Sequence, residues 1–144
     1  MKKIMVYMFL FLGTLGYSQN WKTNFDEAKK EATEQNKKIL LVFSGSDWCA
    51  PCIKLDKNVW QSEEFKVHAN DNYVLLRADF PKKKANTLPA DIKNRNLLLA
   101  DKYNKEGFFP LVVLLDNTGK VLGKKGYENI SASEYITQLK SFIK

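Results

Sequence analysis

The run Ile39-Leu40-Leu41-Val42-Phe43, followed by Ser44-Gly45-Ser46-Asp47-Trp48-Cys49-Ala50-Pro51-Cys52, decides the fold. Five consecutive apolar residues are too few for a buried helix and are typical of a central strand that is covered on both faces. Pro51 suits the first turn of a helix, where its missing N–H is not needed. The stretch therefore predicts a buried strand that leads into a helix, with two cysteines at the junction.

The patterns on either side predict an alternation of helices and strands. The apolar side of the helix after residue 90 is assigned to Ile92 and residues 97–100. A hairpin turn is predicted at Asp116-Asn117-Thr118-Gly119. These elements make one α/β domain of three layers (α/β/α), with a central mixed sheet flanked by helices. Helices are predicted at residues 24–35, 51 to about 69 with a break near Gln61-Ser62, 90–103, and after the capping pair Ser131 and Glu134; strands are predicted at 39–43, 73–78, 111–115 and 120–126.

The N-terminus has the pattern of a signal peptide. Lys2 and Lys3 precede an apolar stretch at 4–15, and small residues follow at Gly16 and Ser18. The stretch is shorter than the roughly 20 residues that span a bilayer, which disfavours an uncleaved anchor. We expect a signal peptide at 1–18, cleavage after Ser18, a single domain at 19–144, and no stable membrane insertion after cleavage. The expected location is the periplasm or the exterior of the cell.

The chain is basic, and its charges are dispersed. Its 144 residues carry a formal net charge of +7, which falls to +5 when Lys2 and Lys3 leave with the signal peptide. The densest basic group, Lys82-Lys83-Lys84, lies in a predicted polar loop at 80–89. Because the lysines form no long basic run, we predict no nucleic-acid partner and interpret them as a solvated surface, with the 82–84 group as a candidate partner contact.

Cys49 and Cys52 are the two cysteines of the chain, and their position predicts thiol–disulfide exchange. A cysteine at a helix N-terminus faces unpaired N–H groups and the positive end of the helix dipole, which favour the thiolate. Cys49 is thus the predicted nucleophile, and Cys52, expected to be less exposed, is the predicted resolving residue. The cycle needs no cofactor and no metal.

Other uses of this pair remain open at this level. A structural disulfide would gain little from so short a loop. A structural zinc site normally takes four Cys or His ligands, whereas this chain offers the pair and His68. Copper handling through the pair and His68 is compatible with thiolate chemistry, although His68 is expected on an exposed helix surface. A binding module with an inert disulfide is the remaining alternative.

These features together resemble the thioredoxin superfamily. The strand at 39–43, the motif at 48–52, the Phe109-Pro110 step before the next strand and the Gly119 hairpin occur in that family's order. The resemblance implies a thioredoxin-like fold and a cis peptide bond before Pro110, close to the active-site sulfurs. It also implies that Trp48, Ala50, Pro51, Phe109 and Pro110 support the site and contact the substrate.

The stretch from Ser44 to Trp60 is most similar to exported relatives such as the periplasmic C-terminal domain of thiol:disulfide interchange proteins. Such relatives usually pass reducing equivalents, and the Ala50-Pro51 dipeptide agrees with a reductase because strongly oxidising relatives tend to carry a histidine there. The resemblance therefore implies a protein-disulfide reductase. We expect it to be a monomer that a membrane-bound thiol electron donor keeps reduced. Oxidase or isomerase activity is the alternative direction.

One position departs from the family. Aligned on Trp48-Cys49, the buried acid that assists deprotonation of the second cysteine is replaced by Phe43. The proton acceptor for Cys52 is then water, Glu106 or Asp47, of which Asp47 is expected to lie too near the surface. We therefore expect resolution by Cys52 to be slower than in a typical thioredoxin.

Overall fold

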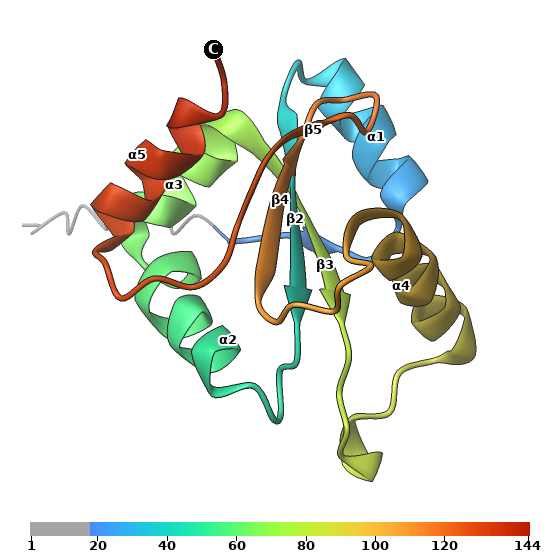
Figure 1. Cartoon of the computed structure of the whole chain (residues 1–144). Helices are drawn as coiled ribbons and strands as arrows, with labels where there is room; N and C mark the ends of the chain where they lie inside the picture. Colours follow the sequence, from blue (N-terminus) through green and yellow to red (C-terminus); the bar gives the residue numbers. More distant parts are fainter. Residues whose placement is uncertain (1–17) are drawn as a thin grey trace, which may run out of the picture.

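A computed structural model describes residues 18–144 and contains a five-stranded sheet in the order β1-β3-β2-β4-β5. In Figure 1, β2 and β4 lie at the middle of the molecule, between two groups of helices. Strands β1, β3 and β2 run parallel, and β4 runs antiparallel to β2 and to β5, so the sheet is mixed as predicted. The strands are β1 (Trp21–Lys22), β2 (Lys38–Ser44), β3 (Tyr73–Asp79), β4 (Leu111–Leu115) and β5 (Val121–Lys125).

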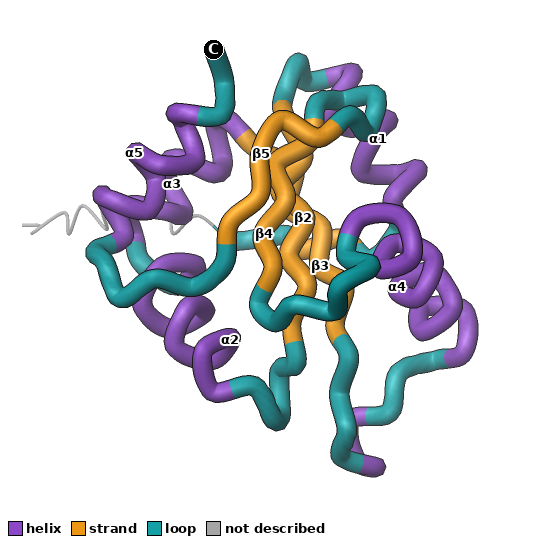
Figure 2. The backbone as a smooth tube through the Cα atoms, in the orientation of Figure 1, coloured by secondary structure: helices purple, strands orange, loops and turns teal. Residues whose placement is uncertain are grey.

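Helices cover both faces of this sheet. Helices α1 and α4 pack on one face, and α2, η1, α3 and α5 pack on the other, as the tube in Figure 2 shows. The three-layer architecture predicted from the alternation of patterns is thereby confirmed. The helices are α1 (Phe25–Glu34), α2 (Ala50–Leu55), the π-helical turn η1 (Asp56–Trp60), α3 (Glu63–Asn72), the short 3-10 turn η2 (Lys84–Asn86), α4 (Ala90–Tyr103) and α5 (Ala132–Ser141).

The apolar run Ile39-Leu40-Leu41-Val42-Phe43 forms the centre of the domain. Residues 39–43 of β2 are buried, and their side chains alternate between the core on the α1 side and the core on the α2 side. In the register, Phe43 pairs with Ala78 of β3 and Leu111 of β4. Burial on both faces explains why β2 and β4 lack polar alternation.

A cluster of aromatic side chains packs between the helices on the α2 side of the sheet. Trp60, at the end of η1, is buried and lies with its ring centroid 4.6 Å from that of Phe65 and 5.5 Å from that of Tyr135. Trp21 of β1 contacts Trp60 edge-on at 6.0 Å. These contacts pack η1, α3, α5 and β1 against one another. Because η1 directly continues α2, they also fix the C-terminal end of the helix that begins at the cysteines.

Several local predictions are confirmed. The first helix was expected to be capped by Thr23 or Asn24, and the Asn24 side chain accepts hydrogen bonds from the N–H groups of Asp26 and Glu27. Ser131 and Glu134 form the predicted capping box of α5. The predicted break near Gln61-Ser62 separates η1 from α3, and Ser62 caps the new helix.

Other local predictions were wrong. The two-residue strand β1 was not predicted, because two residues carry no alternation to detect. On α4, Leu97 and Leu98 are exposed, the latter by 68%, and the buried positions are instead Asn96, Leu99 and Tyr103. The apolar side assigned to residues 97–100 was therefore right for Leu99 and Ala100, which pack on the core, and wrong for Leu97 and Leu98.

The predicted signal peptide falls almost entirely on residues 1–17, which lie outside the described residues. Within residues 18–144, no helix has both the length and the apolar character that crossing a bilayer requires.

Candidate active site

The two cysteines lie where β2 ends and α2 begins. The turn between them is closed by hydrogen bonds from the N–H groups of Trp48 and Cys49 to the carbonyl oxygen of Gly45. Cys49 is the N-cap of α2, and its sulfur accepts the N–H of Cys52 at 3.3 Å. The two residues form a disulfide bond with a Cα–Cα distance of 5.2 Å. The pair thus occupies the predicted strand-to-helix junction.

Both cysteines are largely covered. Each is only 4% exposed, so the prediction that Cys52 would be clearly less exposed than Cys49 was wrong for this disulfide-bonded state. The residues between them, Ala50 and Pro51, are exposed. An approaching partner therefore meets Ala50, Pro51 and the neighbouring apolar surface before it reaches the sulfurs.

The peptide bond between Phe109 and Pro110 is cis, as the family resemblance implied. Pro110 is buried directly before β4, whose first residue, Leu111, pairs with Phe43 of β2. This pairing places the cis bond beside the end of β2 from which the cysteine turn departs.

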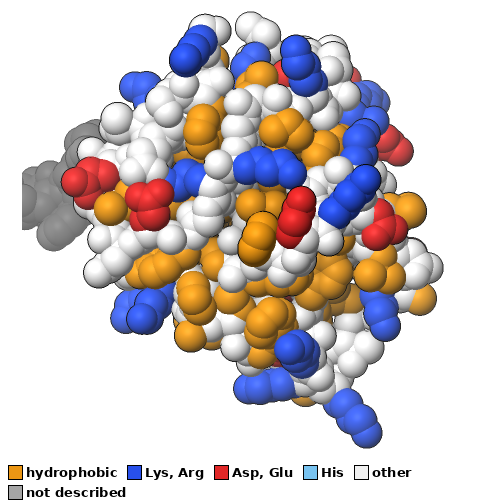
Figure 3. Space-filling view, viewed as in Figure 1, with side chains coloured by type: hydrophobic (Ala, Val, Ile, Leu, Met, Phe, Trp, Pro, Cys, Tyr) orange, Lys and Arg blue, Asp and Glu red, His pale blue; other side chains and the backbone are white. Residues whose placement is uncertain are grey.

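A groove of about 580 Å³ runs from Pro51 along this cis bond toward β5. Figure 3 shows apolar side chains gathered on the lower half of the face in view, where Figure 1 places the start of α2 and the loop before β4. Phe108, on the rim, is 60% exposed, a large value for an aromatic side chain. The other residues that line the groove are Glu106, Phe109, Pro110, Leu111, Lys124, Lys125, Gly126 and Tyr127.

Three aromatic rings border the cysteine turn. The Trp48 ring meets Phe109 edge-on at 5.4 Å, and Phe109 meets Phe80 at 5.5 Å. The Trp48 indole N–H donates to the carbonyl oxygen of Phe80 at 2.7 Å. Gly45 leaves room for the indole, because a Cβ there would lie 2.6 Å from Nε1. Trp48 is thus fixed across the turn and joined to the residue before Pro110.

Two carboxylates, of Asp47 and of Asp79 at the end of β3, connect the cysteine turn to the end of β3 and the loop after it, and we call these contacts the clasp. Asp79 accepts the backbone N–H of Ser46 at 3.0 Å and its hydroxyl at 2.6 Å. Asp47 accepts the N–H groups of Lys82 and Lys83 at 2.9 and 3.0 Å, and the side-chain amide of Asn86 at 3.0 Å. The clasp was not predicted, because its partners are separated by 33–39 residues in the sequence.

The clasp makes stability depend on pH. The backbone N–H of Lys82, the Asn86 amide and the N–H of Lys83 lower the pKa of Asp47 below its ordinary 3.8. Because the folded-state pKa is the lower one, this stabilisation is complete above about pH 5 and declines as pH falls through 3.8.

We therefore expect Asp47→Asn to lower the urea midpoint of unfolding at pH 7 and to lower it by less at pH 3. Because the wild-type protein and the variant share all other carboxylates, the difference between their midpoints at each pH reports Asp47 alone. An equal difference at both pH values would contradict this prediction.

Phe43 is fully buried, as expected at the position of the family's acid. It packs in the core on the α1 side with Ala78 and Leu111. Of the alternative proton acceptors, the Asp47 carboxylate is occupied by the clasp. Glu106 is exposed and lines the groove beside Pro51 and Pro110.

His68 lies apart from the cysteines. It is half-buried rather than exposed, which corrects the sequence prediction, and its Nε2 lies 3.2 Å from the Tyr73 hydroxyl. Burial and the nearby Lys140 lower the pKa of His68. No group of three or more His, Cys, Asp or Glu side chains within residues 18–144 is arranged to hold a metal ion.

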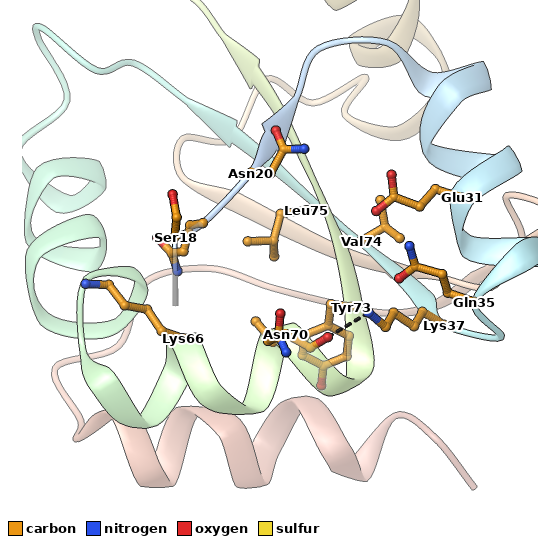
Figure 4. A pocket seen from close by; sticks show the side chains of 12 residues that line it. Ser18, Asn20, Glu31, Gln35, Lys37, Lys66, Asn70, Tyr73, Val74 and Leu75 are labelled. Atoms are coloured by element: carbon orange, nitrogen blue, oxygen red, sulfur yellow. Dashed lines mark hydrogen bonds between the residues drawn. The ribbon is translucent and has the colours of Figure 1, made fainter. Parts of the chain in front are cut away.

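A second pocket, of about 200 Å³, lies at the opposite ends of β2 and β3 (Figure 4). Lys37 crosses it and donates to the backbone carbonyl of Asn70 at 2.6 Å. Tyr73, at the start of β3, also lines it, whereas the cysteines follow the far end of β2. The pocket is therefore separate from the cysteine site.

The structure brings together the residues selected from the sequence: the two cysteines, Trp48, Ala50, Pro51, Phe109 and Pro110. Sequence reasoning missed Phe80 and Asp79, which contact Trp48 and Ser46. One indication of their role was present in the sequence, which is that they directly follow the strand predicted at 73–78, a neighbour of the central strand.

The fold and the cysteine site define a protein of the thioredoxin class. Residues 20–117 match the family model described as Thioredoxin-like, and the chain belongs to this family. It is similar to the disulfide bond reductase DsbH of Chlamydia pneumoniae, with 36% identity over 124 residues that cover 86% of this chain and 72% of that protein.

Solved structures agree with this assignment. A DsbH oxidoreductase structure matches with a TM-score of 0.80 and 34% identity, covering 87% of this chain and 84% of that chain. The C-terminal domain of Neisseria meningitidis DsbD in its oxidised form matches with a TM-score of 0.51 and 17% identity, covering 86% and 98%. The second match supports the fold alone.

Proposed function

We propose that this protein is an exported thiol–disulfide oxidoreductase that reduces protein disulfides in the cell envelope. The observation that carries the proposal is the Cys49–Cys52 disulfide at the N-terminus of α2, beside the groove along cis-Pro110. The similarity to a disulfide bond reductase supports the reducing direction.

In the proposed cycle, the reduced protein acts through Cys49. Its thiolate attacks one sulfur of the client disulfide, forms a mixed disulfide and releases the other client sulfur as a thiolate. Cys52 loses its proton and attacks the Cys49 sulfur, which releases the second client thiolate and leaves the Cys49–Cys52 disulfide. Two electrons thus pass from the dithiol to the client, and a membrane-bound thiol donor returns them.

The surrounding residues have supporting roles in this proposal. Ala50 and Pro51 shape the exposed turn between the sulfurs, and Trp48 with Phe109 forms an apolar wall next to it. An extended client segment lies along Pro110 in the groove. The protein works as a monomer, without cofactor or metal.

The direction of exchange is tested by the reduction potential of the Cys49–Cys52 pair. We expect a value near that of thioredoxin, about −270 mV, whereas a dedicated oxidant lies near −120 mV. Equilibration of the purified domain with defined ratios of reduced and oxidised glutathione or dithiothreitol measures it. A value near −120 mV would reverse the proposed direction.

Export is tested at the N-terminus. We expect the mature protein recovered from the envelope or the medium to begin at Gln19, after cleavage of residues 1–18. Mass spectrometry of the intact protein distinguishes this form from the full chain. Retention of Met1 in the recovered protein would contradict the proposal.

A further inference from the structure

Three consecutive lysines stand next to the cysteine turn. Lys82, Lys83 and Lys84 are all exposed and belong to the loop between β3 and α4. Figure 1 shows this loop extending at the lower end of the molecule, on the side to which the cysteine turn also descends, and Figure 3 shows basic side chains projecting there below the apolar surface. The arrangement places positive charge at the border of the apolar surface that a client meets.

The backbone of Lys82 and Lys83 and the ammonium group of Lys82 have defined positions. The clasp holds the backbone N–H groups of Lys82 and Lys83 on Asp47, which is two residues before Cys49. The Lys82 ammonium group lies 3.9 Å from the centroid of the Trp48 ring. Because Trp48 is the neighbour of Cys49, the charge is held at a defined place beside the nucleophile before any partner arrives.

The charge of this loop is only partly neutralised. None of the three lysines forms a salt bridge with another side chain of the described residues 18–144. The two carboxylates of the clasp, Asp47 and Asp79, offset up to two of the three positive charges, and Asp47 interacts electrostatically with Lys83. No acid lies between Asp79 and Asp91, and Asp91 is paired with Arg95. The loop therefore retains a net positive charge that a partner of opposite sign can use.

We infer that the Lys82–Lys84 loop selects client segments that carry acidic residues beside their disulfide. This inference rests on the proposed reductase function and adds a preference among its substrates. A client sulfur at Cys49 places the flanking residues of its chain near Trp48 and this loop, where client carboxylates would meet Lys82 above Trp48 and the exposed Lys83 and Lys84. Complementary charge raises the rate of encounter and favours one register of binding, and salt screens it.

The test uses two peptide disulfides that differ only in the residues flanking the cysteine, glutamate in one and glutamine in the other. Single-turnover reduction by the reduced domain gives a second-order rate constant for each, and division by its rate with dithiothreitol removes differences in intrinsic reactivity. At low salt we expect an acidic-to-neutral ratio of about five, which falls toward one at about 0.5 M salt.

Two triple variants distinguish the effect of the loop lysines from the effect of the protein's net charge. In Lys82→Gln/Lys83→Gln/Lys84→Gln the ratio should fall to about two or less. The matched control Lys30→Gln/Lys140→Gln/Lys144→Gln removes the same charge from exposed positions on α1, α5 and the C-terminus, and it should keep the wild-type ratio.

An equal fall in both variants would assign the effect to net charge and overturn the inference. A wild-type ratio near one at low salt would also overturn it, and this measurement needs no variant to fold. Failure of the wild-type protein to reduce either peptide would instead contradict the proposed function. The two failures are therefore distinguishable.

Discussion

Replacing Cys49 with serine is expected to reduce catalysed disulfide reduction to the background given by the reductant alone. A serine hydroxyl is not ionised at neutral pH and does not form the mixed disulfide on which the cycle depends. Cys49 is the N-cap of α2, and serine is also a good N-cap residue, so the helix should start normally. Reduction of insulin by dithiothreitol, followed by turbidity, measures the loss.

The matched control is Cys52→Ser, which keeps the nucleophile and removes the resolving thiol. This variant should accumulate a covalent complex with its client, visible on a gel without reductant and absent from the Cys49→Ser variant. Wild-type turnover in the Cys49→Ser protein would sink the proposed function. A trapped complex in Cys49→Ser rather than in Cys52→Ser would exchange the roles of the two cysteines.

The location of this site was predictable because its determinants are local in the sequence. An uninterrupted apolar run predicted β2, and the cysteines follow it within nine residues. The fold followed from similar runs at β3 and β4 and from caps such as Ser131 with Glu134. Each of these signals lies within a single helix or strand, whose type is indicated by the spacing of its apolar residues and whose ends are indicated by its capping residues.

The surroundings of the site were not predictable for the opposite reason. The clasp joins residues 46 and 47 to residues 79–86, and no local pattern marks Asp47 as an acceptor for backbone N–H groups. The face of α4 was misassigned in part, because Leu97 and Leu98 are apolar yet exposed, whereas Asn96 is buried and donates to the carbonyl oxygen of Asp79. Such choices depend on tertiary packing, which overrides the local apolar pattern.

Because Phe43 replaces the usual buried acid, we expect the rate of the resolving step to depend strongly on pH. Cys52 must lose its proton before it attacks the Cys49 sulfur. Phe43 fills the position of the usual acid with apolar contacts, and Asp47 is committed to Lys82, Lys83 and Asn86. Without an internal base, the rate should rise about tenfold per pH unit over the range in which a thiol is mostly protonated, below about pH 8.5.

A chromophoric aromatic disulfide makes this step visible in a stopped-flow instrument. The first chromophore leaves when Cys49 of the reduced protein attacks, and the second leaves when Cys52 resolves the mixed disulfide. The second phase should be independent of reagent concentration, absent in Cys52→Ser, and about a hundredfold faster at pH 8 than at pH 6. A second phase whose rate does not change with pH would contradict the absence of an internal base. If the Glu106→Gln variant then regained the pH dependence, Glu106 would be the proton acceptor. We expect Glu106→Gln to leave the slope unchanged, because the Glu106 side chain is exposed on the rim of the groove and water has equal access there.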